Sequence, residues 1–461
     1  MMRRVAIATV MVAAAILLVL PGPVGRALGG VDPQIVRAGG LALFAVGSWV
    51  LAALPEFVTS ISFFLIAMVL HVAPASVVFS GFASAAWWLV FGGLIAGIAI
   101  DTTGLGRRLA RVAGARLAVS YTGVIAGLVI VAILLAFLMP STMGRVVLFM
   151  PIVVALAERL GFGVGSNGRA GMVMAATLGT YVPSTAILPA NVPNTVLLGA
   201  AEALYGVKLT YGPYLLLHFP IMGILYPAIL IVVILRLFPD KPRPQPVEPA
   251  AAPMSTDERK LAWILGIALF IFVIDFVHGI SPAWVSLAAG LACLIPGIAI
   301  ISAKTFSERM NLAVLIYVAG IVGVGAIISE SGLGARLGTV LIDVVRPTPG
   351  ADTYNFAALV GASIVAGLAT TMVAQPAVLT PMAARIADAA GIPLENVLMM
   401  EVLGFATLLF PYQSPPTVVA MQLGRLGFRQ GGKVCLIMGM ITMAFLLPIA
   451  YVWWRVLGWI G

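Results

Sequence analysis

Long apolar runs alternate with short polar breaks along this chain. Nine runs approach or exceed the length that a helix needs to cross a bilayer, and they lie near residues 5–20, 38–54, 57–71, 81–100, 212–236, 261–279, 281–301, 311–330 and 433–456. The pattern predicts nine simple membrane helices.

Two further regions, 118–203 and 351–423, are apolar but are interrupted at their centres by Pro, Gly, Ser and Thr. Non-helical backbone is tolerated at membrane depth only where it is buried in protein or lines an aqueous cavity. Each region therefore predicts a re-entrant hairpin followed by one broken helix. The prediction is then about eleven transmembrane helices in all.

The two halves of the chain repeat the same landmarks in the same order. The pairs are TGLGRRLA (103–110) with SGLGARLG (331–338), STMGRVVLFMP (141–151) with TMVAQPAVLTP (371–381), and LPANVPNTVLL (188–198) with FPYQSPPTVVA (410–420). In the predicted topology the first hairpin enters from the cytoplasm and the second from outside, so the repeats are inverted. Inverted repeats with paired broken helices are typical of secondary transporters whose site lies near the midplane. The alternative, four unrelated packing kinks, does not account for this pairing.

Composition agrees with a membrane protein. The chain is 61% apolar and 9% charged, with a mean hydropathy of +1.11, whereas soluble domains carry roughly 25% charged residues. The net charge of +9 is divided unequally: with the N-terminus inside, eighteen of the 26 Lys and Arg residues fall on the cytoplasmic side and seven outside. The positive-inside rule therefore predicts a cytoplasmic N-terminus in the inner (plasma) membrane, and nucleic acid is not an expected partner.

The stretch FSGFASAAWWLVFGGLIAGIAIDTTGLGRRLA (79–110) and both interrupted regions resemble the divalent anion/sodium symporter family of carboxylate and sulfate transporters. That family carries Ser-Asn-Thr at each hairpin tip, ten residues before a proline. The equivalent positions here are Ser141, Thr142 and Met143 in the first hairpin, and Thr371, Met372 and Val373 in the second. The family's broken helices end in a Thr-Pro-Pro-Asn-like turn, and here the turns read NVPN (191–194) and SPPT (414–417).

The resemblance implies a scaffold that forms a homodimer and a transport domain that moves as an elevator. The implied parts are first-repeat scaffold helices in 1–117, the first-repeat transport part in 118–237, a cytoplasmic linker in 238–260, second-repeat scaffold helices in 261–350 and the second-repeat transport part in 351–461. The prolines of the linker predict an extended segment.

The candidate substrate-binding residues lie at the two tips and the two breaks. They are Ser141, Thr142, Met143, Arg145, Asn191, Pro193, Asn194, Thr195, Thr371, Met372, Val373, Gln375, Ser414, Pro415 and Thr417. Helix breaks expose N–H groups that suit an anion and carbonyls that suit a small cation. No resident cofactor is predicted.

The resemblance also implies Na⁺ near Ser141, Asn191 and Thr371, but the tip Asn is missing from both hairpins. Sodium needs several hard oxygens, for which a thioether such as that of Met372 is a poor substitute. The residues therefore argue against inherited sodium sites, most of all at the second tip.

Arg145 lies one helical turn after Ser141, where the family has a small Thr, and its counterpart in the second hairpin is Gln375. One hypothesis is that the guanidinium supplies a fixed positive charge beside the anion in place of a bound cation. The alternatives are an ion pair with a buried acid, or a side chain that reaches back to the cytoplasm. Glu401, midway along the second broken helix, is the candidate for proton coupling or for pairing with Arg145.

The function predicted is secondary active transport of small organic anions, carboxylates first, by an elevator-type mechanism in which sodium coupling is in question. An inorganic or sulfonated anion remains an alternative substrate. A cation/proton antiporter of the same superfamily is a second alternative, although it is expected to carry paired acids where Glu401 stands alone. An enzyme is not predicted, because the sequence offers no Ser/His/Asp, metal-binding or paired-carboxylate pattern.

Overall fold

The computed structural model describes residues 2–461 except 52, 106–107, 109–119, 140, 243–252, 275–277, 279 and 299. Throughout this part of the chain every regular element is a helix and no strand occurs. The all-α prediction is confirmed. Residues 243–252 of the predicted linker lie outside the described residues.

The helices of the first half end before that linker. They are α1 (Met2–Val19), α2 (Pro21–Ala27), α3 (Pro33–Val50), α4 (Glu56–Val69), α5 (Ala75–Val78), α6 (Ser80–Ala83), α7 (Ala85–Thr103), α9 (Tyr121–Leu138), α10 (Thr142–Arg159), α11 (Asn167–Thr185), η1 (Leu188–Ala190), α12 (Val192–Tyr205), α13 (Tyr211–His218), η2 (Phe219–Leu225) and α14 (Tyr226–Leu237).

The helices of the second half follow a similar order. They are α15 (Thr256–Val273), α17 (Pro282–Leu294), α18 (Ala303–Arg309), α19 (Leu312–Glu330), α20 (Leu333–Val345), α21 (Asp352–Ala369), α22 (Gln375–Leu379), η3 (Thr380–Met382), α23 (Ala383–Ala390), α24 (Leu394–Ala406), η4 (Pro411–Gln413), α25 (Pro415–Leu423), α26 (Phe428–Ile441), η5 (Thr442–Leu446) and α27 (Leu447–Val456).

Five helical stretches among the described residues are long and apolar enough to cross a membrane by themselves: Ala85–Thr103, Tyr121–Leu138, Tyr211–Leu237, Leu312–Glu330 and Arg429–Val456. Val5–Val19 and Pro21–Ala27, bent by 98° at their junction, make a sixth if they count as one span. The figure of eleven spans therefore stays a prediction.

The predicted span 281–301 is helical only as far as Leu294. Pro296 follows two residues later. A proline disfavours the α conformation in the residue before it, so a helix usually ends at or before that residue. The apolar run continues through this break, which is why hydropathy alone made the span too long.

Both interrupted regions have the predicted architecture. In the first, α9 and α10 are the arms of a hairpin, and α11 and α12 are the halves of a broken helix with η1 in the break. In the second, α21 and α22 are the hairpin arms that meet at its tip, and α24 and α25 are separated by η4. Each tip and each break therefore presents helix ends inside the protein.

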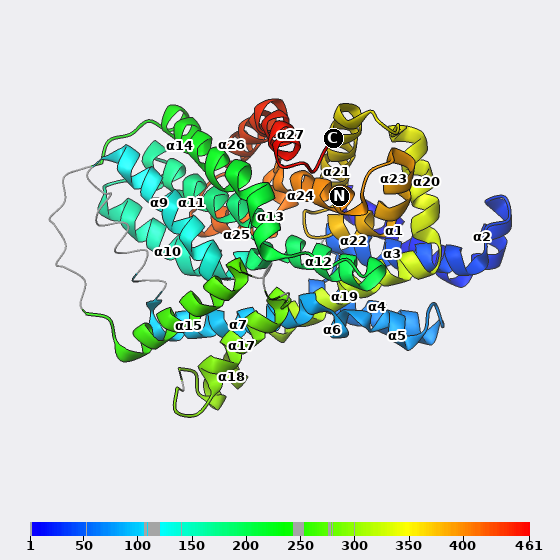
Figure 1. Ribbon diagram of the computed structural model, residues 1–461, viewed down its shortest axis with the longest axis horizontal. Coiled ribbons are helices and arrows are strands. Elements are labelled where there is room, and N and C mark those ends of the chain that lie inside the picture. The colour runs from blue at the N-terminus through cyan, green and yellow to red at the C-terminus, as the bar shows by residue number, and fades with distance from the viewer. Residues whose placement is uncertain are drawn as a thin grey trace.

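The hairpins and broken helices exchange partners between the repeats. Helix α10 of the first hairpin packs against α25 of the second broken helix, and α22 of the second hairpin packs against α12 of the first. This reciprocal pairing is what two-fold-related repeats require. In Figure 1 the hairpin helices α9 and α10, the broken-helix half α11 and the later helix α14 lie above α7, α15 and α17, which pack together as a separate layer.

Small residues allow close contact within that layer. Helix α7 crosses α17 where any side chain on Gly92 would clash with the backbone of Ser286. Membrane helices associate through such small-residue contacts because lipid gives no hydrophobic drive between them. Helix α15 of the same layer contacts α9 of the first hairpin.

An ion pair joins the two halves outside the predicted spans. Arg108 donates to both carboxylate oxygens of Glu258, at 2.9 and 3.1 Å, and to the Pro253 carbonyl at 3.0 Å. The hydrogen bond from Arg108 is the main reason that the pKa of Glu258 lies below its usual value. The ion pair thus ties Arg108 of the first half to the first turn of α15 in the second half.

Two helices at equivalent positions contain a π-helical segment, η2 in the first repeat and η5 in the second. Pro227 and Pro448 each stand two residues past the end of their segment. Proline has no N–H, so it leaves an upstream carbonyl without its helical donor, and a wider π turn accommodates this local defect. The two π segments pack against each other.

Candidate functional site

Two of the three oxygens expected near sodium cap the helices that they precede, and the third accepts a backbone N–H just before its helix. Ser141 Oγ accepts the Gly144 N–H at 3.1 Å, and Asn191 Oδ1 accepts the Asn194 N–H at 3.0 Å. Thr371 Oγ1 accepts a backbone N–H in the same way, three residues on, at 3.3 Å. Small polar side chains are favoured at this position because they satisfy N–H groups that the helix cannot. Each oxygen therefore already has a structural task.

Arg145 joins the first hairpin to the first broken helix. The side chain is fully buried. Its Nη1 donates to the carbonyls of Met139 and of Ala190, the latter at 2.8 Å. Its Nη2 donates to Thr142 Oγ1 at 3.0 Å and to the Thr180 carbonyl at 3.3 Å. The guanidinium thus sits among three carbonyls and a hydroxyl.

These carbonyls are available because helices end there. Met139 follows the last residue of α9, and Ala190 is the last residue of η1, so neither carbonyl has a full set of helical partners. Carbonyls freed at helix breaks are the ligands that transporters offer to Na⁺. Here a tethered cation, the guanidinium of Arg145, occupies that environment.

The charge of Arg145 is not balanced by a carboxylate. Among the described residues no acid forms an ion pair with it, and Glu401 bonds elsewhere. The reach-back alternative is wrong, because the side chain is 0% exposed. The Nε–H has no hydrogen-bond partner in the described part of the chain. Arg145 therefore has one N–H group without a hydrogen-bond partner and a positive charge without an acidic partner among the described residues.

Asn194 fills the first break. Its Nδ2 donates to the Ile187 carbonyl at 2.9 Å and to the Thr185 carbonyl at 3.1 Å, and its Oδ1 has no partner among the described residues. Pro193 supplies no N–H at the start of α12, and the Thr195 hydroxyl donates back within that turn. Side chains thus satisfy backbone groups at the break.

Gln413 fills the break of the second repeat, as Asn194 fills that of the first. It was not among the residues predicted from the sequence. Its Oε1 accepts the N–H groups of Leu409 and Phe410 at 2.9 and 2.8 Å, and its Nε2 donates to the Gly367 carbonyl at 3.0 Å. Its carbonyl accepts the Met372 N–H at 2.9 Å, which joins the second tip to the second break. The matched landmarks already aligned it with Asn191 and could have identified it.

The SPPT turn itself is closed. Thr417 Oγ1 donates to Ser414 Oγ at 3.0 Å, and both residues are buried. Pro415 and Pro416 remove two N–H groups from the start of α25. The second break is therefore a poorer source of anion-binding N–H groups than the first.

Glu401 lies at a junction of three elements. Its Oε2 accepts the Thr380 hydroxyl at 2.9 Å, and the Thr380 carbonyl accepts the Tyr205 hydroxyl at 2.7 Å. Gln375 Nε2 donates to the Glu401 carbonyl at 3.3 Å and to the hydroxyl of Ser363. The Glu401 side chain is 4% exposed, and its Oε1 has no partner among the described residues. Sequence reasoning missed Thr380 and Tyr205, which only tertiary folding brings here.

Comparison with known proteins decides the family. The family described as Sodium:sulfate symporter transmembrane region matches residues 2–460. The chain belongs to this family of membrane transporters. A membrane protein of Cupriavidus necator is 25% identical to this transporter over 394 residues, which are 83% of this chain and 77% of the relative. The crystal structure of the Alcanivorax borkumensis YdaH transporter shares its fold, with a TM-score of 0.58 and 14% identity over 84% of this chain and 88% of that one.

The transporter therefore gathers most of the predicted residues around its own helix breaks. Within the first repeat Arg145 joins the tip to the break, and between the repeats the Tyr181 hydroxyl donates to the Phe405 carbonyl at 3.0 Å. Met143 is 37% exposed and Met372 is fully buried, so the two tips differ in what they present. The predicted approach of the two tips to one midplane site stays a prediction.

Proposed function

We propose that this transporter carries small monovalent organic anions, with carboxylates as the leading class. The observation that supports this is the fully buried Arg145, which bonds to carbonyls and a hydroxyl, has no acidic partner among the described residues and keeps one N–H unused. An unbalanced buried charge costs several kcal/mol. A bound anion removes that cost.

In this proposal Arg145 also lets the site in the first repeat work without sodium. A guanidinium among freed carbonyls supplies the positive charge that a sodium ion brings in other transporters. One fixed charge balances a monovalent anion and leaves a dianion with an excess negative charge. Monovalent substrates are therefore favoured over dicarboxylates and sulfate.

In this proposal the coupling ion is a proton, and Glu401 binds it. A buried carboxyl with one hydroxyl donor and one free oxygen can take up and release a proton as the site changes exposure. Uptake of an anion together with a proton moves no net charge. Proton coupling replaces sodium coupling in this scheme.

Transport proceeds by elevator-type alternating access in this proposal. The moving part comprises the hairpins, the broken helices and the helices that follow them, and the scaffold comprises the remaining helices, which form a homodimer. The protein is placed in the plasma membrane with its N-terminus in the cytoplasm. Cysteine accessibility from each side of the membrane, before and during transport, tests this arrangement.

The test of function is counterflow in proteoliposomes. Liposomes loaded with unlabelled propionate, acetate, succinate, sulfate or an alkanesulfonate are diluted into the labelled anion, in sodium and in choline. The proposal expects exchange of monocarboxylates at rates that agree within about twofold in the two salts. Steep, cooperative dependence on sodium would contradict it and would mean that a cation site has been built from other oxygens.

Sulfate is the second candidate substrate, because the family's description names sodium and sulfate. Arg145 can also contact a sulfate or sulfonate through hydrogen bonds of the same geometry. Counterflow of sulfate that exceeds that of every monocarboxylate would favour this candidate. A cation/proton antiporter is tested in the same vesicles by proton release on addition of sodium or potassium without any anion.

A further inference from the structure

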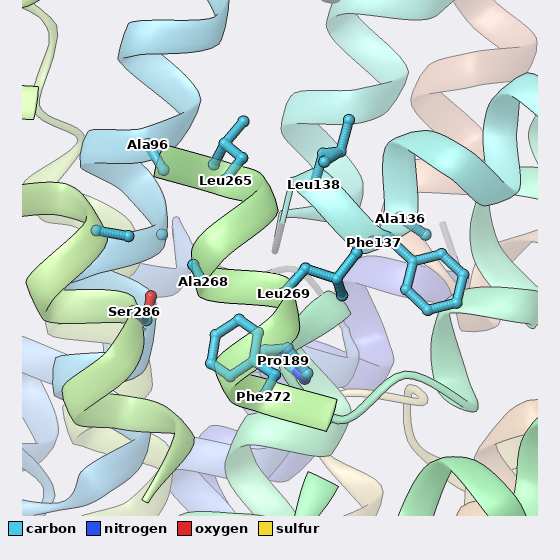
Figure 2. A pocket seen from close by; sticks show the side chains of 12 residues that line it. Ala96, Ala136, Phe137, Leu138, Pro189, Leu265, Ala268, Leu269, Phe272 and Ser286 are labelled. Carbon is cyan, nitrogen blue, oxygen red and sulfur yellow. The ribbon is translucent and has the colours of Figure 1, made fainter. Parts of the chain in front are cut away.

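A cavity of about 30 Å³ lies beside the first hairpin, between two sets of helices (Figure 2). Helices α7, α15 and α17 form one wall, with Ala268 and Ser286 among its residues, and the end of α9 with η1 forms the other, through Leu138 and Pro189. The Ser286 hydroxyl is already satisfied, because it donates to the Leu89 carbonyl at 2.9 Å. The other lining side chains are apolar.

This cavity shares its backbone with the Arg145 site. Leu138 directly precedes Met139, and Pro189 directly precedes Ala190. The carbonyls of Met139 and Ala190 are two of the acceptors that hold the guanidinium. The same two chain ends therefore present an apolar surface on the cavity side and hold a positive charge through their carbonyls.

The side chains of this cavity do not stabilise an ordered water molecule. The cavity has room for a water molecule, but an ordered water needs two to four polar partners. No lining side chain offers a free one, because the Ser286 hydroxyl is already bonded. A methyl-sized apolar group fits the space and its chemistry.

We infer that the cavity receives the apolar end of the transported anion, so that the preferred substrates are monocarboxylates with a short alkyl chain. The inference rests on the proposed function, in which the carboxylate meets the Nε–H of Arg145. Leu138 and Pro189, which line the cavity, each precede a residue whose carbonyl holds the guanidinium, and an amphipathic anion matches this pairing of apolar surface and charge. Affinity then rises about fourfold for each methylene that enters the cavity and stops rising when the cavity is full.

The experiment measures competition by formate, acetate, propionate, butyrate and hexanoate against radiolabelled propionate, with the transporter in proteoliposomes. Ala268→Val fills the cavity from α15. Ala262→Val is the matched control, since it makes the same change in the same helix at a position that does not line the cavity. Leu269→Ala enlarges the cavity from the same helix and keeps the test available if the filled variant does not fold.

The expected result is that Ala268→Val weakens competition by propionate and butyrate at least about tenfold and leaves formate within about twofold, while the control behaves as the wild type. Leu269→Ala should move the optimum to a longer chain. The inference is overturned if wild-type affinity does not depend on chain length, or if Ala268→Val weakens every anion equally. The latter result would mean that the cavity is a packing gap between helices and does not contact the substrate. Absence of any anion exchange would instead defeat the proposed function itself.

Discussion

The two repeats build the same backbone breaks and fill them with opposite chemistry. At the first tip and break, Arg145 places a positive charge among carbonyls. In the second, the equivalent position is the neutral Gln375, and the ionisable side chain nearby is the acid Glu401. In the proposed function, the first half attracts the anion and the second accepts the proton.

Both repeats show that side chains can satisfy a helix break. A break in a membrane helix requires partners for its backbone N–H and carbonyl groups wherever it occurs. In the first repeat the partners come from Arg145 and Asn194, and in the second from Gln413. In the proposed function these side chains take the place of a bound cation.

The largest expected effect follows from removal of the first repeat's charge. Arg145→Ala should weaken anion binding by at least about 30-fold, since loss of a buried charged partner costs roughly 2–5 kcal/mol. Arg145→Lys should restore only part of it, because an ammonium lacks the planar fork. Binding to the purified variants is compared with their thermal stability.

Arg169 provides the control for that comparison. It is also buried, at 3% exposed, but it pairs with Glu158 at 3.2 Å and bonds to the Gly424 carbonyl. Arg169→Ala should lower stability and leave anion binding unchanged. If Arg145→Ala behaves in the same way, Arg145 is a structural residue and the argument for monovalent substrates is withdrawn.

The second effect concerns the acid of the other repeat. Wild-type uptake should rise as the pH falls, and Glu401→Gln should give a flat profile across roughly pH 5–8 while anion binding remains measurable. Thr380→Val should move the midpoint of the profile to higher pH, because the charged carboxylate loses its hydroxyl donor. Glu395→Gln, an exposed change in the same helix, is the control. A pH profile that survives in Glu401→Gln would assign Glu401 to packing.

Smaller effects are expected from the side chains that fill the breaks. Asn194→Ala and Gln413→Ala each leave two or more buried backbone groups unpaired, which should cost about 1–3 kcal/mol. Thermal unfolding of the detergent-solubilised variants measures both. Equal losses would show that the two breaks need the same support. A loss confined to one variant would show that water or lipid replaces the side chain in the other repeat.

The smallest effect concerns the link between the repeats. Tyr181→Phe removes the bond from its hydroxyl to the Phe405 carbonyl, and such interhelical bonds in membranes are worth about 0.6 kcal/mol on average. Tyr214→Phe is the matched control, because its bond, to the Thr185 carbonyl, lies within the first repeat. A shift in transport rate with Tyr181→Phe alone would show that this contact, inside the proposed moving part, affects transport.

The sequence was sufficient to predict the fold because the breaks are local features. Pro, Gly, Ser and Thr inside the apolar regions 118–203 and 351–423 predicted hairpins and broken helices, and the structure contains both. The error at 281–301 arose where an apolar run continued past Pro296, since hydropathy does not report the helix end. The number of spans depends on such ends and stays a prediction.

The chemistry of the site was less accessible to sequence. The position of Arg145 was visible, but its acceptors come from three different segments, at Met139, Thr180 and Ala190. Glu401 was identified as an isolated acid, whereas its partner Thr380 lies in another element. Hydrogen bonds between distant segments leave no periodic pattern in the chain, so only the fold reveals them.

The paired π segments bear on how the gene for this protein evolved. A π turn places one extra residue in a helix, and it is less stable than the regular helix that a single deletion would restore. Such a feature is easily lost unless selection maintains it. Phe219–Leu225 and Thr442–Leu446 nonetheless stand at equivalent points of the two halves, each followed by a proline at the same spacing. The simplest genealogy is that the insertion and its proline were present in a single ancestral gene before it duplicated and fused.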